Sequence, residues 1–371
     1  MKIIVAYASA GRGHQKAAEV IAGAVRTRCP RHTVVLADSL DFSLPLFKKA
    51  YLASYDFLVL HLTWLWGALF YLTSAPAFAA AALAAHSCCN HLAARRFARW
   101  LTEQNPDVII STHFLVSDVA SRLKGKNRLH ARLYTVITDF GVHPFWLAGH
   151  TDCYCVASGH TRDILVSYGV NPGAIRITGI PVDPVFKQVF ERRALRARYG
   201  IAPSAFVVLV VTGSFGIGPL EEIACALHGE CEVLVVCARN RKLFKRLNAR
   251  KLDRVQVFGF VNTMPEMMSL ADLIITKPGG LSVAELLVQS LPPLFIAAIP
   301  GQESGNSETL LRYGIGAPVN DIPRLQRIIR NYLAHPEALA LQRQRMKELA
   351  KPNAVEEIID AICSGGTRSA G

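Results

Sequence analysis

The feature that most constrains the fold is a strand that ends directly in a glycine loop, a pattern that the chain repeats. Within residues 274–306, the apolar run Ile274–Ile275 leads into Pro278-Gly279-Gly280 and then into a helical segment. A second apolar run, Leu291–Ile299, leads into the segment Pro300–Asn306. Short apolar runs bounded by glycine and proline are typical of buried parallel strands. Open α/β sheets bind ligands at the carboxyl ends of such strands, so we expect both loops to line a binding site.

Two interpretations of Glu285 compete. In the first, Ser282 to Glu285 form a capping box, in which Ser282 is the N-cap of the following helix. In the second, the carboxylate binds a sugar diol, which the small residues Gly279 and Gly280 allow to approach closely. Spacing alone favours the capping box.

The second loop shifts the balance toward sugar recognition. Gln302, Glu303 and Asn306 follow a predicted strand, on a loop kept tight by Pro300 and Gly301. Amides and a carboxylate suit neutral hydroxyls, because each hydroxyl needs both a donor and an acceptor.

Length and composition suggest two domains and an anionic partner. A chain of 371 residues is long for one domain, and 51% of its residues are hydrophobic, which is enough to fill two cores. Lysine and arginine outnumber aspartate and glutamate by 41 to 28, giving a formal net charge of +13. This excess favours nucleic acid or an acidic membrane surface. No nucleic-acid fingerprint accompanies it, so we expect a membrane partner and no nucleic acid.

The chain begins with another strand-and-loop unit. We expect a strand at Lys2–Tyr7, a glycine loop at residues 8–14 and a helix at Gln15–Arg28. The loop is not a P-loop, and it is not a dinucleotide fingerprint because Lys16 occupies the third glycine position. The start turns polar too soon for a signal peptide. The nine cysteines form no paired Cys-x-x-Cys motif, so we expect a reducing cytosol and neither a zinc site nor a disulfide framework.

His14 stands at the start of that first helix, next to Gly13. The positive end of a helix lowers the pKa of a histidine, which keeps the ring neutral and able to accept a proton. Taken alone, the position favours the alternative, an ordinary surface histidine.

The segment Phe57–Ala94 contains no aspartate, glutamate, lysine or arginine, and it carries Trp64 and Trp66. A transmembrane helix of about 20 apolar residues is one interpretation, and a pair of buried core helices is another. A span would place two sides of one domain in different compartments. A monotopic element that inserts its aromatic residues into the headgroup layer therefore fits better. Three basic residues follow on a helix that suits an anionic interface: Arg95, Arg96 and Arg99.

Other polar loops also follow predicted strands. The strand Tyr134–Thr138 leads into Asp139 and His143, which either line an acceptor site or form a structural turn, with the two alternatives evenly balanced. The strand Phe206–Val211 leads into a loop whose amides suit a phosphate. The residues of that loop are Gly213, Ser214, Phe215, Gly216 and Gly218. Further strands are expected at Thr33–Ala37, Asp107–Ser111, Asp152–Ala157, Ile175–Thr178, Val233–Cys237 and Val255–Phe258, with a hinge at Gly179–Phe186.

Four of these segments resemble one known family. Lys277–Glu285 and Pro300–Asn306 resemble the donor-binding half of glycosyltransferase family 28, most closely its monogalactosyldiacylglycerol synthase and diacylglycerol glucosyltransferase branch. Ser9–Ala18 resembles the Gly-x-Gly-His signature of the same branch, and Thr138–Trp146 resembles its Thr-Asp-x-x-x-His-x-x-Trp segment. The resemblance covers residues 1–349.

The resemblance implies a GT-B fold, in which two Rossmann-like α/β domains face each other across a cleft. It implies an acceptor- and membrane-binding domain at residues 1–182 and a UDP-sugar-binding domain at 183–345. A C-terminal helix and a frayed tail would occupy residues 346–371.

The resemblance also implies roles for single residues. His14 would be the catalytic base and Asp139 a second catalytic residue, Glu285 would bind the ribose, and Gln302 and Glu303 would bind the donor sugar. The loop 213–218 would bind the pyrophosphate. The other residues expected at the donor site are Phe260, Val261, Lys277, Gly279, Gly280, Leu281 and Asn306. The residues expected on the acceptor or membrane side are Gly13, His143, Trp64, Trp66, Arg95, Arg96 and Arg99.

Together these expectations describe an inverting glycosyltransferase. It would move galactose or glucose from a UDP-hexose to diacylglycerol or a similar lipid, as a peripheral, monotopic protein on the cytoplasmic face of a membrane. We expect no cofactor, because the UDP-sugar is itself the donor. We expect no metal, because the amides of the 213–218 loop would stabilise the diphosphate and the sequence has no clear Asp-x-Asp motif. The alternatives are a peptidoglycan-precursor N-acetylglucosaminyltransferase, a soluble nucleotide-sugar epimerase of the same fold and a non-catalytic binding protein.

Overall fold

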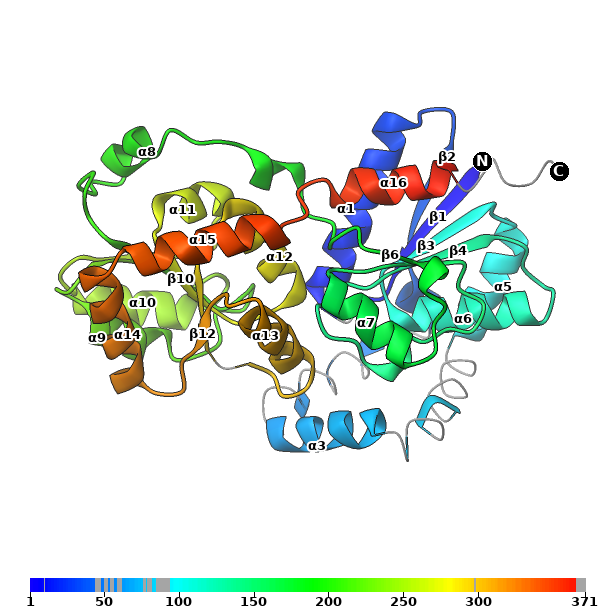
Figure 1. Ribbon diagram of the computed structural model, residues 1–371, viewed down its shortest axis with the longest axis horizontal. Coiled ribbons are helices and arrows are strands. Elements are labelled where there is room, and N and C mark those ends of the chain that lie inside the picture. Colours follow the sequence, from blue (N-terminus) through cyan, green and yellow to red (C-terminus); the bar gives the residue numbers. More distant parts are fainter. Residues whose placement is uncertain are drawn as a thin grey trace. The chain divides into compact units, whose positions relative to one another are not determined.

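The computed structural model describes residues 1–9, 11–43, 48, 49, 53, 57, 58, 62–75, 78, 82–84, 94–296 and 298–364. The chain divides into two compact units (Figure 1). Unit 1 comprises Met1–Asp183, Ile299–Gly305 and Lys351–Gly371, and unit 2 comprises Pro184–Ala298 and Asn306–Ala350. Segments far apart in the sequence therefore belong to the same unit.

Unit 1 is built on a parallel sheet with strand order β2-β1-β3-β4-β5-β6. Ile4 of β1 lies opposite Val35 and Ile109 in the neighbouring strands. Both faces of β1 are buried, which explains its continuous apolar run. The strands are β1 (Lys2–Tyr7), β2 (Thr33–Asp38), β3 (Val108–Ser111), β4 (Arg132–Val136), β5 (Cys153–Cys155) and β6 (Ile175–Arg176).

Helices cover both faces of this sheet. Ile3 and Val5 pack in one cluster with α1 (Arg12–Arg28) and the C-terminal helix α16 (Ala354–Ser364). Ile4 and Ala6 point to the other face, toward α5 (Arg95–Gln104) and α6 (Phe114–Gly125). The remaining helical elements are η1 (Ser39–Phe42), α3 (Thr63–Ser74), η2 (Pro144–Trp146), α7 (Gly159–Ser167) and η3 (Pro172–Ala174).

Unit 2 contains a second parallel sheet, with strand order β12-β11-β10-β7-β8-β9. Its strands are β7 (Val207–Val211), β8 (Glu232–Val236), β9 (Val255–Phe258), β10 (Leu273–Thr276), β11 (Pro293–Phe295) and β12 (Ala317–Pro318). Its helices are η4 (Pro184–Lys187), α8 (Arg192–Arg198), α9 (Leu220–Leu227), α10 (Arg241–Arg250), α11 (Met264–Leu270), α12 (Gly280–Gln289), α14 (Ile322–Ala334) and α15 (Glu337–Leu349). The two parallel sheets with their helices confirm the predicted α/β class.

Several predicted elements end or begin elsewhere; the strand expected at Tyr134–Thr138, for example, is β4 and ends at Val136. The strand expected at Leu291–Ile299 is only Pro293–Phe295, and α13 (Gln302–Arg312) begins where a loop was expected. Gly301 has a φ of +86°, a left-handed conformation that turns the extended chain into the helix. Three residues that were predicted on a loop therefore lie on a helix: Gln302, Glu303 and Asn306.

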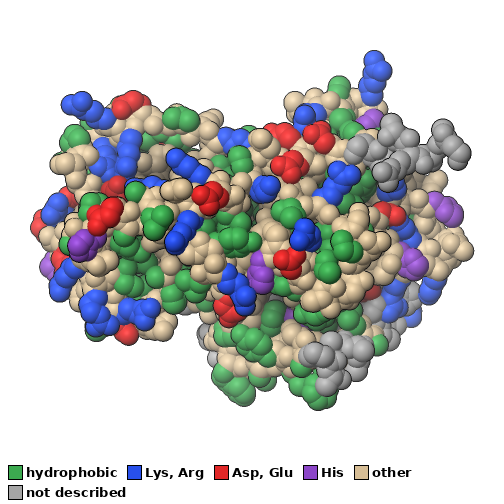
Figure 2. All heavy atoms as spheres, viewed as in Figure 1, with side chains coloured by type: hydrophobic (Ala, Val, Ile, Leu, Met, Phe, Trp, Pro, Cys, Tyr) green, Lys and Arg blue, Asp and Glu red, His purple; other side chains and the backbone are tan. Residues whose placement is uncertain are grey.

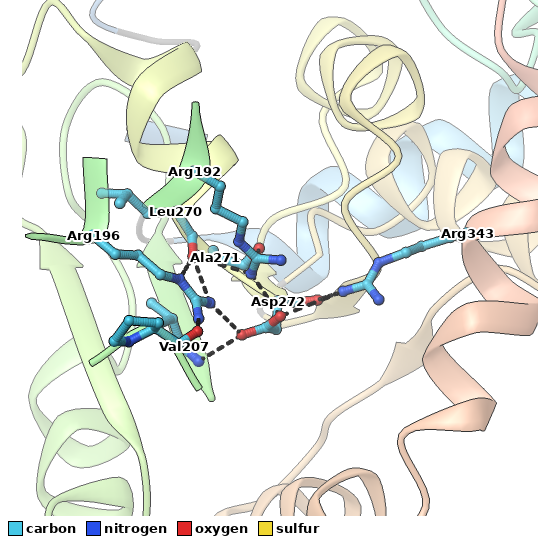
Figure 3. Close-up of polar contacts among 8 residues, drawn as sticks. Arg192, Arg196, Val207, Leu270, Ala271, Asp272 and Arg343 are labelled. Carbon is cyan, nitrogen blue, oxygen red and sulfur yellow. Dashed lines mark hydrogen bonds and ion pairs between the residues drawn. The ribbon is translucent and has the colours of Figure 1, made fainter. Parts of the chain in front are cut away.

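Asp272 fixes the first α-helix of unit 2 (Figure 3). It lies just before β10 and accepts hydrogen bonds from Arg192 Nη2 at 2.6 Å, Arg196 Nη2 at 2.9 Å and the Val207 amide at 2.9 Å. Arg343 of α15 donates to the Asp272 carbonyl oxygen at 3.1 Å. Because Arg192 and Arg196 both belong to α8, the network holds this helix at the amino ends of β7 and β10.

Helix α3 of unit 1 exposes large apolar side chains. Trp64 is 71% exposed, Tyr71 56%, Leu72 49% and Leu69 44%. Figure 2 shows hydrophobic side chains gathered at the lower edge of the view, where Figure 1 draws α3. These exposures do not fit a buried core helix. Within the part of the chain that the structure describes, no helix has the length and apolar character that crossing a membrane requires.

Candidate functional site

His14 is almost fully buried in unit 1, within the first turn of α1. The helix begins at Arg12, three residues earlier than expected, so His14 does not precede the helix but belongs to it. His14 Nδ1 lies 2.8 Å from the Thr112 carbonyl oxygen and 2.8 Å from Thr138 Oγ1. A carbonyl oxygen can only accept, so Nδ1 carries the hydrogen and Nε2 of the neutral ring is left as the basic nitrogen.

Burial lowers the pKa of His14, and the negative charge of Asp139 and the hydrogen bond to Thr112 oppose that effect only in part. The ring is therefore neutral at neutral pH. It packs against two other rings, with centroids 4.7 Å away for His113 and 6.1 Å away for Trp146. A neutral, oriented histidine beside a carboxylate has the properties of a general base.

Asp139 is also buried, and it contacts a predicted sugar-binding residue. Gln302 Nε2 donates a hydrogen bond to Asp139 Oδ2 at 3.1 Å, and both residues belong to unit 1. Next to them, a Cβ atom built on Gly141 would lie 3.4 Å from Gly305 Cα. Unit 1 thus brings the segment after β4 into contact with Ile299–Gly305.

His143 takes part in the local structure through both ring nitrogens. Its Nδ1 accepts a hydrogen bond from the Phe145 amide at 3.1 Å, which makes His143 the cap of η2. Its Nε2 therefore carries the hydrogen and lies 3.1 Å from Thr73 Oγ1 in α3. Both ring nitrogens of His143 therefore have partners within the fold, whereas the contacts given for His14 involve Nδ1.

Unit 2 has a pocket of about 200 Å³ at the carboxyl ends of β7, β8 and β10. Five of the predicted donor-site residues line it: Gly213, Ser214, Phe260, Val261 and Glu285. Its other lining residues include Met264, Met268 and Thr276. Residues from three strand ends therefore meet at one edge of the sheet, as expected for a nucleotide site.

The glycine loop after β7 bends sharply. Gly213, Gly216 and Gly218 all have positive φ, at +75°, +59° and +144°. A Cβ atom on Gly216 would lie 2.2 Å from the Cys237 carbonyl oxygen, so no other residue fits there. Asn240 Nδ2 donates to the Gly216 carbonyl oxygen at 3.1 Å and secures the bend. The loop leads into the N-terminus of α9, and such an arrangement presents amides to an anion.

The capping box predicted at Ser282–Glu285 is wrong. The N-cap of α12 is Gly279, with extended backbone and no side-chain cap, and the Val283 amide donates to the Gly279 carbonyl oxygen at 2.9 Å. Ser282 and Glu285 both line the pocket instead.

The other predicted donor residues lie outside the pocket lining. Asn306 is fully buried, and its Nδ2 donates to the Pro278 carbonyl oxygen at 3.0 Å, which supports the glycine loop before α12. Glu303 Oε2 accepts a hydrogen bond from the Ile299 amide at 2.7 Å, which stabilises the start of α13. The pocket lining does not include Phe215, Gly216, Gly218, Lys277, Gly279, Gly280, Leu281, Gln302, Glu303 or Asn306.

Sequence reasoning missed two residues after β8. Ala238 lines the pocket with a φ of +49°, an uncommon conformation for a residue with a side chain. The Arg239 guanidinium lies 5.9 Å from the centre of the exposed Phe260 ring. The sequence signal for these two residues is their position after a predicted strand, in the segment Cys237-Ala-Arg-Asn240. This segment carries no glycine, the residue by which the other binding loops were recognised.

On the predicted membrane side, Arg95, Arg96 and Arg99 are exposed on α5, while Phe97 and Leu101 bury its other face. Trp64 is exposed and Trp66 is half-buried, both on α3. Gly13 is half-buried next to His14. Much of the remainder of Phe57–Ala94 lies outside the described residues.

No group of three histidine, cysteine, aspartate or glutamate residues is arranged to hold a metal ion among the residues that the structure describes. The cysteines described there are free thiols.

The chain matches two family models. Residues 14–182 match monogalactosyldiacylglycerol (MGDG) synthase, and residues 207–358 match the glycosyltransferase family 28 C-terminal domain. The chain is 33% identical over 376 residues to a probable chloroplastic monogalactosyldiacylglycerol synthase of Nicotiana tabacum, with 96% of this chain and 69% of the relative covered. It is 27% identical over 274 residues to a processive diacylglycerol beta-glucosyltransferase of Bacillus subtilis, with 72% and 71% covered.

Solved structures are similar over nearly the whole chain. MurG of Acinetobacter baumannii has a TM-score of 0.64 at 15% identity, covering 98% of this chain and 99% of that chain. Anabaena HepE in complex with UDP has a TM-score of 0.58 at 14% identity, covering 98% and 100%. These likenesses confirm the GT-B fold. The sequence matches establish that the chain belongs to the monogalactosyldiacylglycerol synthase family, with a glycosyltransferase family 28 C-terminal domain at residues 207–358.

Proposed function

We propose that this protein transfers a hexose from a UDP-sugar to the hydroxyl group of diacylglycerol or a similar membrane lipid. The observation that carries the proposal is the buried His14, whose tautomer leaves Nε2 as a base and whose pKa is lowered. The names of the relatives, monogalactosyldiacylglycerol synthase and diacylglycerol beta-glucosyltransferase, supply the substrate class.

The pocket of unit 2 suits the UDP part of the donor. Phe260 and Val261 would border the base, and Glu285 would accept hydrogen bonds from the ribose hydroxyls. The amides of residues 213–218 and the N-terminus of α9 would stabilise the diphosphate. Gln302 and Asp139, which are hydrogen-bonded to each other, offer donors and acceptors for sugar hydroxyls.

The proposed reaction is a single displacement that inverts the anomeric centre. The lipid hydroxyl oxygen forms a bond to the anomeric carbon while the bond from that carbon to the UDP oxygen breaks. The hydroxyl proton passes to His14 Nε2, and the electron pair leaves with the diphosphate. The negative charge of Asp139 favours the imidazolium that this step creates, since the same charge raises the proton affinity of His14.

The acceptor would be reached from a lipid surface. The exposed apolar side chains of α3 suit insertion into the headgroup layer, and the exposed arginines of α5 suit an anionic surface. This arrangement is peripheral and monotopic, on the cytoplasmic face.

The test is mass spectrometry of lipids formed by the purified protein in diacylglycerol vesicles with UDP-galactose or UDP-glucose. A hexosyl-diacylglycerol with inverted anomeric configuration is the expected product. Two other results would favour the alternatives if no glycolipid forms. They are transfer of N-acetylglucosamine to a polyprenyl diphosphate precursor and epimerisation of the free nucleotide sugar.

A further inference from the structure

Helix α3 packs closely against the segment Ile299–Gly305 within unit 1. A Cβ atom on Gly67 would lie 2.7 Å from Pro300 Cβ, and a Cβ atom on Gly301 would lie 2.3 Å from the Phe70 ring. Neither position has room for a methyl group. The helix and the segment are therefore in contact along two successive turns of α3.

A polar contact extends this packing. The Tyr71 hydroxyl lies 3.3 Å from Ser304 Oγ, and the same Ser304 Oγ accepts a hydrogen bond from the Gly301 amide at 2.8 Å. Gln302 lies inside the turn that this bond closes, and it donates to Asp139. The orientation of Gln302 thus depends on a turn that α3 contacts directly.

The same helix also contacts the segment that carries Asp139. The Phe70 and His143 rings have centroids 4.5 Å apart, and Thr73 Oγ1 lies 3.1 Å from His143 Nε2. Both partners of the pair between Asp139 and Gln302 therefore stand on segments that α3 holds.

The opposite face of α3 faces outward. Exposed positions recur at Trp64, Ala68 and Leu72, which is the spacing of one helical stripe. The contact positions 67 and 70 lie on another stripe. Neither stripe carries a charged side chain, so the outward face suits the lipid surface of the proposed function.

We propose that Gly67, Phe70 and Tyr71 are positioning residues for the segment that carries Gln302, so that the lipid surface which seats α3 also tightens binding of the donor sugar. This inference rests on the proposed function, because it takes Gln302 as a sugar-binding residue and a membrane as the partner of α3. Linkage then requires that vesicles strengthen UDP-hexose binding and that UDP-hexose strengthens vesicle binding by the same factor.

A matched pair of substitutions separates the contact from helix stability. Gly67→Ala improves helix propensity but forces Pro300 away, whereas Ala68→Gly lowers helix propensity at an exposed position and leaves the contact in place. We expect Gly67→Ala to weaken UDP-hexose binding about tenfold or more, as a displaced binding group does. Ala68→Gly should leave it within about twofold, because a surface substitution away from the contact has little effect.

Two further variants test the side chains. Tyr71→Phe removes only the hydroxyl and should weaken UDP-hexose binding about 2–10-fold, the loss expected for one neutral hydrogen bond. Trp64→Ala alters the outward face and should reduce vesicle binding. It should therefore also reduce the gain in UDP-hexose affinity that vesicles give. Circular dichroism and thermal unfolding check that each variant remains folded.

Calorimetric titration of the full chain with UDP and with UDP-hexose tests the proposal. Each titration is run with and without phosphatidylcholine–phosphatidylglycerol vesicles that lack diacylglycerol. We expect vesicles to tighten UDP-hexose binding about fivefold or more, a typical coupling, without changing UDP binding, and we expect Gly67→Ala to abolish this gain. Three results would overturn the proposal: vesicles that change UDP and UDP-hexose affinity equally, vesicles that leave the UDP-hexose affinity of the wild type unchanged, or a loss of UDP-hexose affinity in Ala68→Gly equal to that in Gly67→Ala. These titrations need no acceptor, so they can show the coupling even if the wild type makes no glycolipid. A wild type that shows the coupling but makes no glycolipid would count against the proposed function alone.

Discussion

His14 combines features that a surface histidine lacks: burial, a fixed tautomer and a neighbouring carboxylate. A lipid hydroxyl is a poor nucleophile at neutral pH, so His14→Ala should lower turnover by about 10²–10⁴-fold. UDP affinity should stay unchanged, because the pocket proposed for the nucleotide belongs to unit 2. Parallel assays of glycolipid formation and UDP binding check this. More than about a tenth of wild-type turnover in the variant would exclude His14 as the base.

The pH profile of the wild type gives an independent check on the same residue. Burial lowers the pKa of His14 below its ordinary value of 6.5, and only the neutral ring accepts a proton. Activity should therefore be retained below pH 6.5 and fall only as the pH drops through the lowered pKa. We expect the acidic limb of kcat/KM below that value. A limb above pH 7 would mean that another group, or a raised pKa, controls the rate.

Glu285 lines the pocket of unit 2, and the backbone of Gly279 caps α12 in its place. Glu285→Ala should therefore weaken UDP binding by about 1–3 kcal/mol, the loss expected when a charged acceptor is removed. Thermal stability should change little, because no cap is lost. Calorimetric titration with UDP and a melting curve measure the two effects. Unchanged UDP affinity would remove Glu285 from the donor site.

At the scale of elements, the hydrogen bonds of Asp272 attach α8 to unit 2. Asp272→Ala would leave Arg196, which is 5% exposed, without its carboxylate. We expect a loss of about 3 kcal/mol in the free energy of unfolding, the low end for breaking a buried ion pair, because Arg192 is partly exposed. Denaturant unfolding measures it. The exposed pair of Arg330 and Glu230 is the control, and Glu230→Ala should cost less than about 1 kcal/mol.

Helix α5 presents three arginines to solvent while Phe97 and Leu101 anchor it in unit 1. Replacing Arg95, Arg96 and Arg99 by glutamate should weaken binding to anionic vesicles by about 1 kcal/mol per lost basic residue. The effect should shrink as salt rises. Vesicle sedimentation checks it.

A second set of charge reversals provides the control for α5. Arg241, Lys242 and Lys245 are exposed on α10 of unit 2, and replacing them by glutamate changes the net charge by the same amount. If both triple variants lose equal vesicle affinity, the overall charge binds the lipid and α5 has no special part in it.

At the scale of the whole molecule, the membrane should hold this protein without a span. Wild-type protein bound to anionic vesicles should be released by alkaline carbonate, which strips peripheral proteins. Retention in the vesicle fraction after that treatment would contradict a monotopic attachment. Phosphatidylcholine vesicles without an anionic lipid serve as the comparison, and they should bind less protein because a net charge of +13 gains nothing there.

The sheets could be predicted from the sequence because their strands are continuous apolar runs, and Val255–Phe258 was placed to the residue. The starts of α1, α12 and α13 could not, because Gly11, Gly279 and Gly301 set them through backbone geometry. The hydrogen bond from Gln302 to Asp139 joins residues 163 positions apart, and no local pattern encodes such a contact. The uncharged segment Phe57–Ala94 allowed three interpretations: a transmembrane helix, a pair of buried helices or a monotopic element. Hydropathy could not decide among them, because it does not show which face of α3 is covered.

The C-terminal helix α16 completes the core of unit 1, where Ile358 and Ile362 pack with Ile21 and Val25 of α1. These two helices are far apart in the sequence, at Arg12–Arg28 and Ala354–Ser364. All of residues 184–350 are synthesised in between, which takes on the order of 10–30 s at ordinary rates of translation. During that interval the sheet of unit 1 can already pack against α1, but the part of the core that α16 supplies is missing. A gene fragment that stops before residue 351 should therefore yield aggregated protein. In the cell, unit 1 would need protection from aggregation until α16 has been synthesised.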